Sequence, residues 1–154
     1  MIYKTIKGMR KLLVILVLAL AAAFGATTAY GDDFAIPFEQ LPAVSQSFVK
    51  THFLGIQVAY CTKDSHSFEV HMGDGSEIEF DYLGNWEDVD CKYKAVPDSV
   101  IELIPLEIPN YVKANFPSTL ITKVKVKTWG YELELNTGLE LEFNKAGKFM
   151  RIDD

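Results

Sequence analysis

Histidine, cysteine and tryptophan are scarce in this chain: its 154 residues include three, two and two of them. The histidines, His52, His66 and His71, lack the spacing of metal ligands, so we expect no metal site. The sequence also lacks a glycine-rich phosphate loop, a serine in a Gly-x-Ser-x-Gly setting and a cysteine–histidine signature. These absences argue against an enzyme and against a bound cofactor.

Basic residues are outnumbered as well: 15 lysines and arginines stand against 21 aspartates and glutamates. Four of the basic residues precede Leu12, namely Lys4, Lys7, Arg10 and Lys11, and no acidic residue precedes Asp32. The chain after this leader therefore has 11 basic and 21 acidic residues, which give a formal charge of −10. Such an acidic domain is a poor ligand for nucleic acid or an anionic membrane surface. An exported or envelope protein with a basic patch, or a cation, suits it better as a partner.

No apolar run reaches the roughly 20 residues of a membrane span. The longest, from Leu12 to Phe24, follows the basic residues and precedes small residues that fit cleavage after Ala29. This pattern predicts a secretory signal peptide over residues 1–29. The alternative is an uncleaved N-terminal anchor. After cleavage we expect a periplasmic or secreted protein that does not insert into a membrane.

The most informative feature that is present is an internal repeat. Shifted so that Phe68-Glu69-Val70 falls on Tyr131-Glu132-Leu133, the chain aligns with itself without a gap. We call this constant shift the repeat offset. Matching aromatic and glycine positions are typical of two copies of one supersecondary unit. We predict repeat unit 1 over residues 30–91, a linker over 92–97 and repeat unit 2 over 98–154.

Each copy combines a helix with strands. Apolar residues spaced by three and four predict a short helix after Pro42 and another after Pro105, where Pro109 favours a late start or a bend. Strict alternation of apolar and polar residues, as in Tyr131 to Leu135, then predicts half-buried antiparallel strands. The predicted fold class is α+β, a tandem repeat of two units. Each unit is a short helical segment packed on a four-stranded antiparallel meander sheet.

The turns fix the registers of these strands. A three-residue loop at residues 136–138 pairs Leu133 with Leu141, and the matching loop at residues 73–75 pairs Val70 with Ile78. Both registers place the apolar residues on one face and the carboxylates on the other, which a slip of one residue would not do.

The exposed sheet faces are therefore rich in carboxylates. In the second copy, Lys123, Lys125 and Arg151 on flanking strands are expected to neutralise the glutamates, whereas the first copy has no such lysine ladder. Such a face is suited to docking a basic protein patch or to weak cation binding; the alternative is a solvated face that resists edge-to-edge association. Cross-strand glutamates also have the spacing of the two catalytic carboxyl groups of glycosidases. Acid catalysis, however, needs one carboxyl group in an apolar pocket that raises its pKa, and the sequence implies no such pocket.

Aromatic residues at turns are the other candidate binding feature. Trp129 has no aromatic counterpart at the equivalent His66, and exposed tryptophan near a loop is typical of an interface anchor. Trp86 corresponds to Phe149, which also favours a structural role in closing the last hairpin. The candidate protein-binding residues are Glu69, His71, Asp74, Glu77, Glu79, Trp86 and Trp129.

Cys61 and Cys91 both follow the leader, and two cysteines in an oxidising compartment suggest a disulfide. The registers argue against it, because Cys61 falls on the first strand of the meander and Cys91 follows the fourth. Three strand spacings of about 4.8 Å separate those strands, whereas a disulfide requires Cα atoms less than about 7 Å apart. We predict that the two cysteines are not bonded to each other.

The order of the motifs resembles that of the PepSY-like, beta-lactamase-inhibitor-like exported proteins of Bacteroides-type bacteria. In this chain the motifs are Leu41-Pro42 before a helix, then Phe68-Glu69-Val70, the run from Gly75 to Asp81, and Gly84-Asn85-Trp86. The resemblance covers nearly the whole chain after the leader, in both copies. It implies tandem units like the beta-lactamase inhibitor fold, which bind through the exposed sheet face and the Gly73-Asp74-Gly75 loop of the first unit.

We therefore expect an exported, non-enzymatic protein-binding module with an inhibitor-like shape. The alternative is a structural or cation-binding periplasmic protein without a dedicated protein target.

Overall fold

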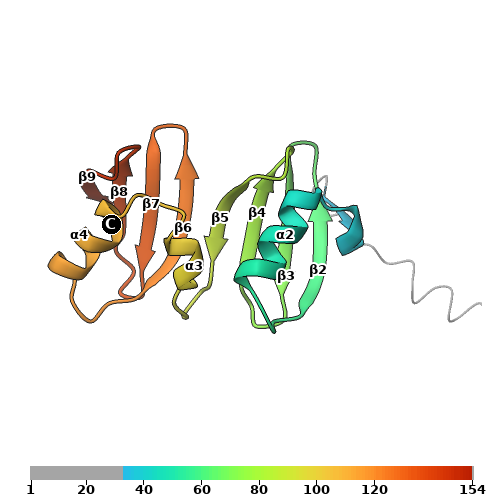
Figure 1. Ribbon diagram of the computed structural model, residues 1–154, viewed down its shortest axis with the longest axis horizontal. Coiled ribbons are helices and arrows are strands. Elements are labelled where there is room, and N and C mark those ends of the chain that lie inside the picture. The colour runs from blue at the N-terminus through green and yellow to red at the C-terminus, as the bar shows by residue number, and fades with distance from the viewer. Residues whose placement is uncertain (1–32, 154) are drawn as a thin grey trace, which may run out of the picture. The chain divides into compact units, whose positions relative to one another are not determined.

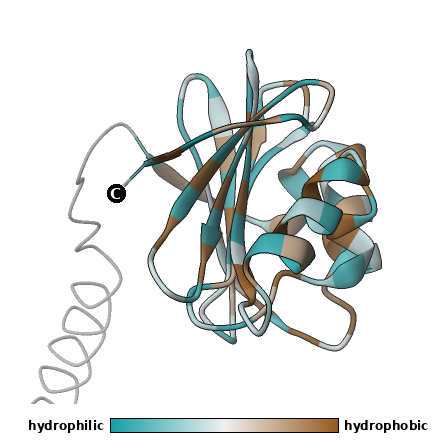
Figure 2. Cartoon of the chain, turned by 90° about the vertical axis from the view of Figure 1, so that its left-hand side faces the viewer, coloured by the Kyte–Doolittle hydropathy of each residue, from teal (hydrophilic) through white to brown (hydrophobic). Residues whose placement is uncertain are grey.

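Nine antiparallel strands form one sheet in the computed structural model, which describes residues 33–153. The signal peptide predicted over residues 1–29 lies outside the described residues. The strands follow one another in chain order from β1 to β9, and the helices lie on one side of the sheet (Figures 1 and 2). The fold is therefore α+β with an antiparallel meander, and its core lies between the sheet and the helices.

The elements alternate between strands and short helical segments. In chain order they are β1 (Phe34–Ile36), η1 (Phe38–Gln40), α2 (Ala43–His52), β2 (Val58–Lys63), β3 (Ser67–Met72), β4 (Glu77–Asp81), β5 (Trp86–Asp90), α3 (Asp98–Ile101), α4 (Glu107–Asn115), β6 (Ile121–Lys127), β7 (Gly130–Leu135), β8 (Glu140–Asn144) and β9 (Phe149–Asp153).

Prolines position the helices as the sequence predicted. Pro42 is the N-cap of α2. N–H groups at the start of a helix have no partner within it, so the N–H group that proline lacks is not needed there. Helix α4 begins late, at Glu107, which leaves Pro109 within the first turn. The four-residue helix α3 was not predicted; it follows Pro97 and buries Val100.

The strand registers agree with those predicted from the turns. Val70 pairs with Ile78 between β3 and β4, and Leu133 pairs with Leu141 between β7 and β8. These two pairs are related by the repeat offset, and all four side chains are fully buried. Alternation along each strand therefore places the same set of residues on the core face that the sequence pattern indicated.

The sequence predicted a four-stranded sheet in each unit, and the structure joins both meanders in one nine-stranded sheet. Strand β5 pairs with β6, with Val89 opposite Val124, so the two meanders form one continuous sheet, and β1 adds a further strand beside β2. Backbone hydrogen bonds from Cys91 and Val96 to the β6 side reinforce this junction. Turn and alternation signals are local, and they carry no information about which edges meet.

Aromatic residues join the helices to the sheet in the same way in both halves. The ring of Phe48 from α2 meets Phe80 edge-on at 5.6 Å and stacks on Trp86 at 5.8 Å. Tyr111 from α4 meets Phe143 edge-on at 5.5 Å and stacks on Phe149 at 4.5 Å. Trp86 therefore packs on the core side of the sheet, in the structural position that its correspondence to Phe149 indicated.

Both cysteines are free and buried. Cys61 lies in β2 opposite Val70, and Cys91 directly follows β5, so β3 and β4 separate them. This arrangement agrees with the register argument against a disulfide.

Candidate binding face

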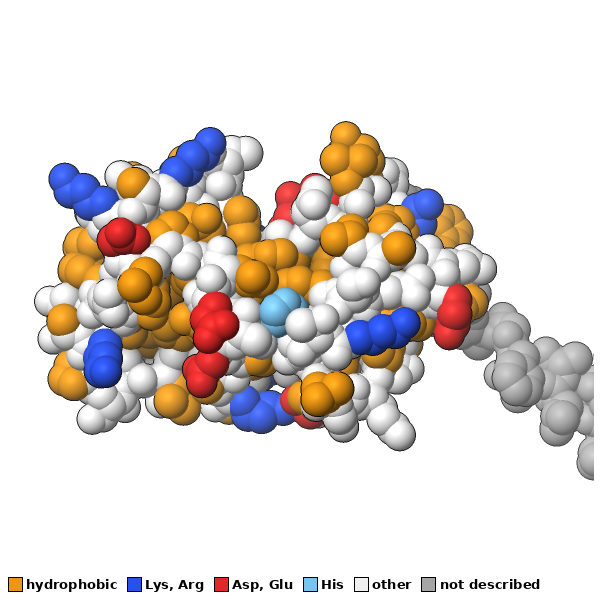
Figure 3. All heavy atoms as spheres, in the orientation of Figure 1, with side chains coloured by type: hydrophobic (Ala, Val, Ile, Leu, Met, Phe, Trp, Pro, Cys, Tyr) orange, Lys and Arg blue, Asp and Glu red, His pale blue; other side chains and the backbone are white. Residues whose placement is uncertain are grey.

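The face of the sheet opposite the helices carries two rows of charged side chains that run across the strands. Residues directly opposite each other on neighbouring strands make up each row. The upper row is Glu69, Glu79, Asp88, Lys125, Glu132, Glu142 and Arg151, and the lower row is His71, Glu77, Asp90, Lys123, Glu134, Glu140 and Asp153. No helix of the described residues covers this face, whereas apolar side chains gather on the helix side (Figures 2 and 3).

The prediction about the lysines needs correction. Lys123 and Lys125 of β6 pair with carboxylates of β5: their Nζ atoms lie 3.6 and 3.3 Å from Oδ2 of Asp88. A further cation, Lys92, lies 2.6 Å from Glu77. The first half does have neutralising lysines: the β5–β6 pairing brings Lys123 and Lys125 from the second half of the chain, and Lys92 lies just after β5.

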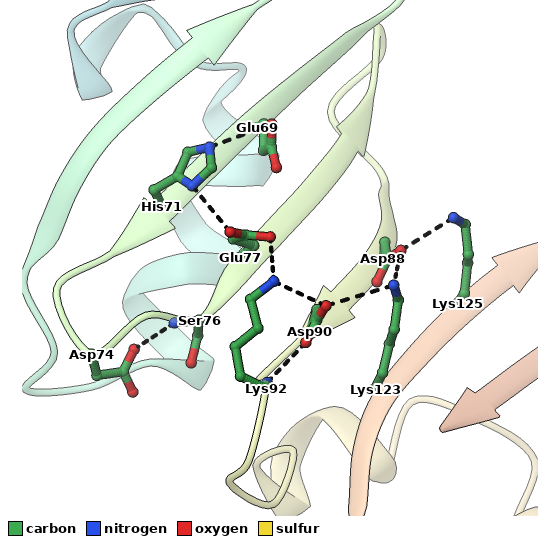
Figure 4. Close-up of polar contacts among 10 residues, drawn as sticks. All are labelled: Glu69, His71, Asp74, Ser76, Glu77, Asp88, Asp90, Lys92, Lys123 and Lys125. Carbon is green, nitrogen blue, oxygen red and sulfur yellow. Dashed lines mark hydrogen bonds and ion pairs between the residues drawn. The ribbon is translucent and has the colours of Figure 1, made fainter. Parts of the chain in front are cut away.

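His71 lies between two of the predicted site residues. Its ring nitrogens are 3.4 Å from Glu69 and 3.6 Å from Glu77, and its ring stacks on Tyr60 at 4.1 Å. Figure 4 shows His71 and the two glutamates on neighbouring strands. Together with Glu79, they form one continuous polar surface, as the sequence predicted.

The other predicted residues lie elsewhere. Asp74 is in the β3–β4 turn, where its carboxylate accepts hydrogen bonds from the Ser76 amide and from Lys94 Nζ, at 3.0 and 2.6 Å. Burial alone would raise the pKa of Asp74, but these bonds outweigh it and the pKa is lowered. Trp86 faces the core, and Trp129 lies in the β6–β7 turn with 39% of its surface exposed.

A small hollow lies among the carboxylates of β3, β4 and β5. Its volume is about 50 Å³, and it is lined by Glu69, Glu77, Glu79, Asp88, Asp90 and Lys123. Asp88 and Asp90 were not among the binding residues predicted from the sequence. Their position in the hollow depends on two registers, that of β4 with β5 and that of β5 with β6.

Asp88 is the most unusual of these side chains. The residue is only 8% exposed, and its Oδ1 atom has no hydrogen-bond partner within residues 33–153. Burial raises the pKa of Asp88, although Lys123 and Lys125 act in the opposite direction. Burial would also raise the pKa of the neighbouring Asp90, but hydrogen bonds from Lys92 outweigh it and lower that pKa. Of these two carboxylates, Asp90 is therefore well compensated and Asp88 is not.

Comparison with known proteins identifies the family. The model described as “Putative beta-lactamase-inhibitor-like, PepSY-like” matches residues 66–151. The chain belongs to this PepSY-like family. The resemblance seen in the motifs is thus confirmed. No curated protein matches the chain at a significant level.

Solved structures of Bacteroides proteins are similar over most of this PepSY-like chain. One, from Bacteroides thetaiotaomicron, is described as a “putative calcium-regulated periplasmic protein”; it is 36% identical, with a TM-score of 0.74, over 80% of this chain and 98% of its own. Two from Bacteroides vulgatus are described as putative periplasmic proteins. One is 34% identical, with a TM-score of 0.74, over 82% of this chain and 100% of its own. The other is 35% identical, with a TM-score of 0.73, over 79% of this chain and 99% of its own.

None of these descriptions names an enzyme. Within residues 33–153, no helix is both long and apolar enough to cross a membrane.

Proposed function

We propose that the mature chain is a non-enzymatic binding module of the bacterial envelope that docks a basic surface of another exported protein. The similar Bacteroides proteins are described as periplasmic, which supports export of this chain too. The docking surface is the open sheet face with its two charged rows.

The excess of carboxylates on this face carries the proposal. The two rows hold ten carboxylates, and the cations in or beside them are five: Lys92, Lys123, Lys125, Lys127 and Arg151. A field of one sign attracts a partner of the opposite sign and raises its association rate. Paired strands also present their side chains at regular spacings, which favours specificity.

We further infer that the two halves are copies of one unit. Support comes from strand pairs, strand irregularities and aromatic contacts that recur at the repeat offset, such as the bulges after Glu79 and Glu142. The copies share one sheet but differ in charge, because the first has Asp88 where the second has Arg151. Docking on the first copy is therefore favoured for a basic partner.

Affinity capture from envelope extract tests the proposal. The mature protein should retain a partner with a basic surface at low ionic strength and release it as salt is raised, because exposed charges are screened within about 10 Å at 0.1 M salt. A specific partner that is acidic, or that stays bound equally well at 1 M salt, would overturn docking by the charged rows.

A structural or cation-binding role is the second candidate. The observation that favours it is the description of the Bacteroides thetaiotaomicron relative as calcium-regulated. A melting temperature that rises with calcium concentration would support this candidate, and one that stays constant would count against it.

A further inference from the structure

We infer that the mature chain forms a two-fold dimer, in which the outer edge of β9 pairs antiparallel with β9 of a second copy. In this register Ile152 lies opposite Ile152 of the second copy, and Arg151 of each copy lies opposite Asp153 of the other. The two sheets then continue into each other. This dimer is independent of which partner protein docks on the charged rows.

The outer edge of β9 is available for pairing. Among the strands of residues 33–153, β9 pairs with β8 alone and forms one end of the sheet (Figure 1). The strand at the other end, β1, has three residues, whereas β9 has five, and Met150 and Ile152 are 53% and 45% exposed. Very short edge strands discourage edge-to-edge pairing, whereas a longer edge with exposed apolar side chains favours it.

The β5–β6 junction shows how the corresponding edge of the first half is paired. Strand β9 corresponds to β5 at the repeat offset, and a bulge lies at the same position in both. Three residue pairs join β5 to β6, one apolar pair on the core face between two pairs of opposite charge. They are Val89 with Val124, Asp88 with Lys125, and Asp90 with Lys123.

Self-pairing of β9 reproduces this pattern. Ile152 lies opposite Leu141 on the core face, and Arg151 and Asp153 lie on the charged face. With the two-fold axis at Ile152, the apolar pair lies between two pairs of Arg151 with Asp153. Opposite charges directly across a strand pair are stabilising. An axis at Arg151 would instead place two arginines opposite each other, so the charges select the register.

The second copy also supplies a cation that this edge needs. Asp153 lies opposite Glu140, and like charges in such a pair are unfavourable. The corresponding Asp90 of the first half also lies opposite a glutamate, but there Lys123 of the next strand comes within 3.6 Å of it. In the dimer, Arg151 of the second copy takes the place of this lysine.

The backbone groups of β9 suit this register. In the first half, the Cys91 amide donates a hydrogen bond to the Thr122 carbonyl, at 2.8 Å. Backbone groups of an antiparallel strand alternate in direction, so those of Val89, two residues earlier, also point to β6. Ile152 corresponds to Val89, so its N–H and C=O groups point away from β8. Two such residues facing each other exchange both hydrogen bonds, with their Cα atoms about 5.5 Å apart.

Pairing of β9 with itself gives a closed assembly. Both copies use the same edge, so growth stops at the dimer. The axis is perpendicular to the sheet, which leaves the helices of both copies on one side and the charged faces on the other. The contact is a single strand pair, and small interfaces bind weakly. We therefore expect dimers at high protein concentration.

Sedimentation velocity at protein concentrations up to about 1 mM, which detects a Kd in that range, tests this dimer. The wild type should shift from monomer to dimer as its concentration rises. Asp153→Lys places a cation opposite Arg151 of the other copy and should weaken dimerisation at least tenfold. Glu102→Lys is the matched control: it makes the same change of charge at an exposed position beside α3 and should dimerise like the wild type.

Cysteine substitution tests the register. Mild oxidation should link Ile152→Cys into a covalent dimer, because Cα atoms about 5.5 Å apart are within the range of a disulfide. Met150→Cys is the control, since Met150 is similarly exposed. The two copies of this residue lie four residues apart along the strands, at least about 13 Å, and should not be linked. The native Cys61 and Cys91 are both buried.

Two results would overturn the dimer. One is a wild type that remains monomeric at every concentration. The other is a wild-type dimer that Asp153→Lys does not weaken and that Ile152→Cys does not link, which would mean that the copies meet elsewhere. Circular dichroism of each variant separates loss of dimerisation from loss of fold. Asp153→Lys removes the like-charge pair with Glu140, so it should keep the fold.

Discussion

Asp88 and Asp90 are neighbours on the same face of β5, yet their surroundings act on them in opposite directions. Asp90 accepts hydrogen bonds from the backbone amide and the Nζ atom of Lys92, at 2.8 and 3.1 Å, which hold its pKa down despite its burial. Asp88 is more deeply buried and has a raised pKa. The charged face of the sheet therefore combines carboxylates that stabilise the fold when ionised with one that does not.

This contrast predicts opposite effects of neutralising the two residues. An acid whose pKa is raised on folding stabilises the fold while protonated, and it loses that contribution as the pH rises through its folded pKa. The wild type should therefore lose stability relative to Asp88→Asn as the pH rises above the ordinary aspartate value of 3.8. At pH 7 the variant should be at least as stable as the wild type.

Asp90→Asn is the control with the opposite sign. The pKa of Asp90 is lowered on folding, so its contribution is present at neutral pH and is lost as the pH falls through the folded pKa. Urea unfolding at a series of pH values measures both variants. A wild type that gains stability relative to Asp88→Asn on going from pH 4 to pH 7 would contradict the account of Asp88.

At the scale of elements, the β4–β5 turn packs directly on the start of α2. Gly84 in this turn has φ +91°, and a Cβ atom there would lie 2.6 Å from Pro42 and 2.7 Å from Val44. The Ser45 hydroxyl also donates a hydrogen bond to the Gly84 carbonyl, at 2.9 Å. In the second half Gly147 approaches Pro105 in the same way, at 2.8 Å. Each glycine thus lies where a turn of the sheet packs against a helix.

Gly84→Ala should therefore be markedly destabilising. The left-handed backbone costs alanine about 1–2 kcal/mol, and the clash with α2 adds about 1–3 kcal/mol. Gly75→Ala is the matched control, because Gly75 has φ +89° with no atom within 4 Å of the added Cβ and should show the backbone cost alone. Thermal or urea unfolding measures both. Equal losses of stability would mean that the turn does not pack on α2 as described.

The same elements show what the sequence could and could not predict. Loop lengths and alternation are local, so they were enough to pair Glu69 with Glu79 and His71 with Glu77. The β5–β6 pairing joins strands that two helices separate along the chain, and no local signal encodes it. The deeply buried Asp88 was missed as a site residue for the same reason, since its environment comes largely from β6.

At the scale of the described molecule, the β5–β6 junction determines where charge accumulates. It places the lysines of β6 in the middle of the two rows, between the carboxylates of β5 and those of β7. The first half of the sheet keeps its excess of negative charge at β3 and β4, farther from β6. Docking of a basic partner should therefore depend most on Glu69, Glu77 and Glu79.

The most direct test of this account is the affinity of the captured partner for two variants with the same change in charge. One carries Glu69→Gln, Glu77→Gln and Glu79→Gln on the charged face of the sheet. The other carries Asp98→Asn, Glu102→Gln and Glu107→Gln, which lie on or beside the helical segments α3 and α4. The account predicts at least tenfold weaker binding for the face variant and near-wild-type binding for the helix variant. Equal affinities for the face variant and the wild type would contradict it.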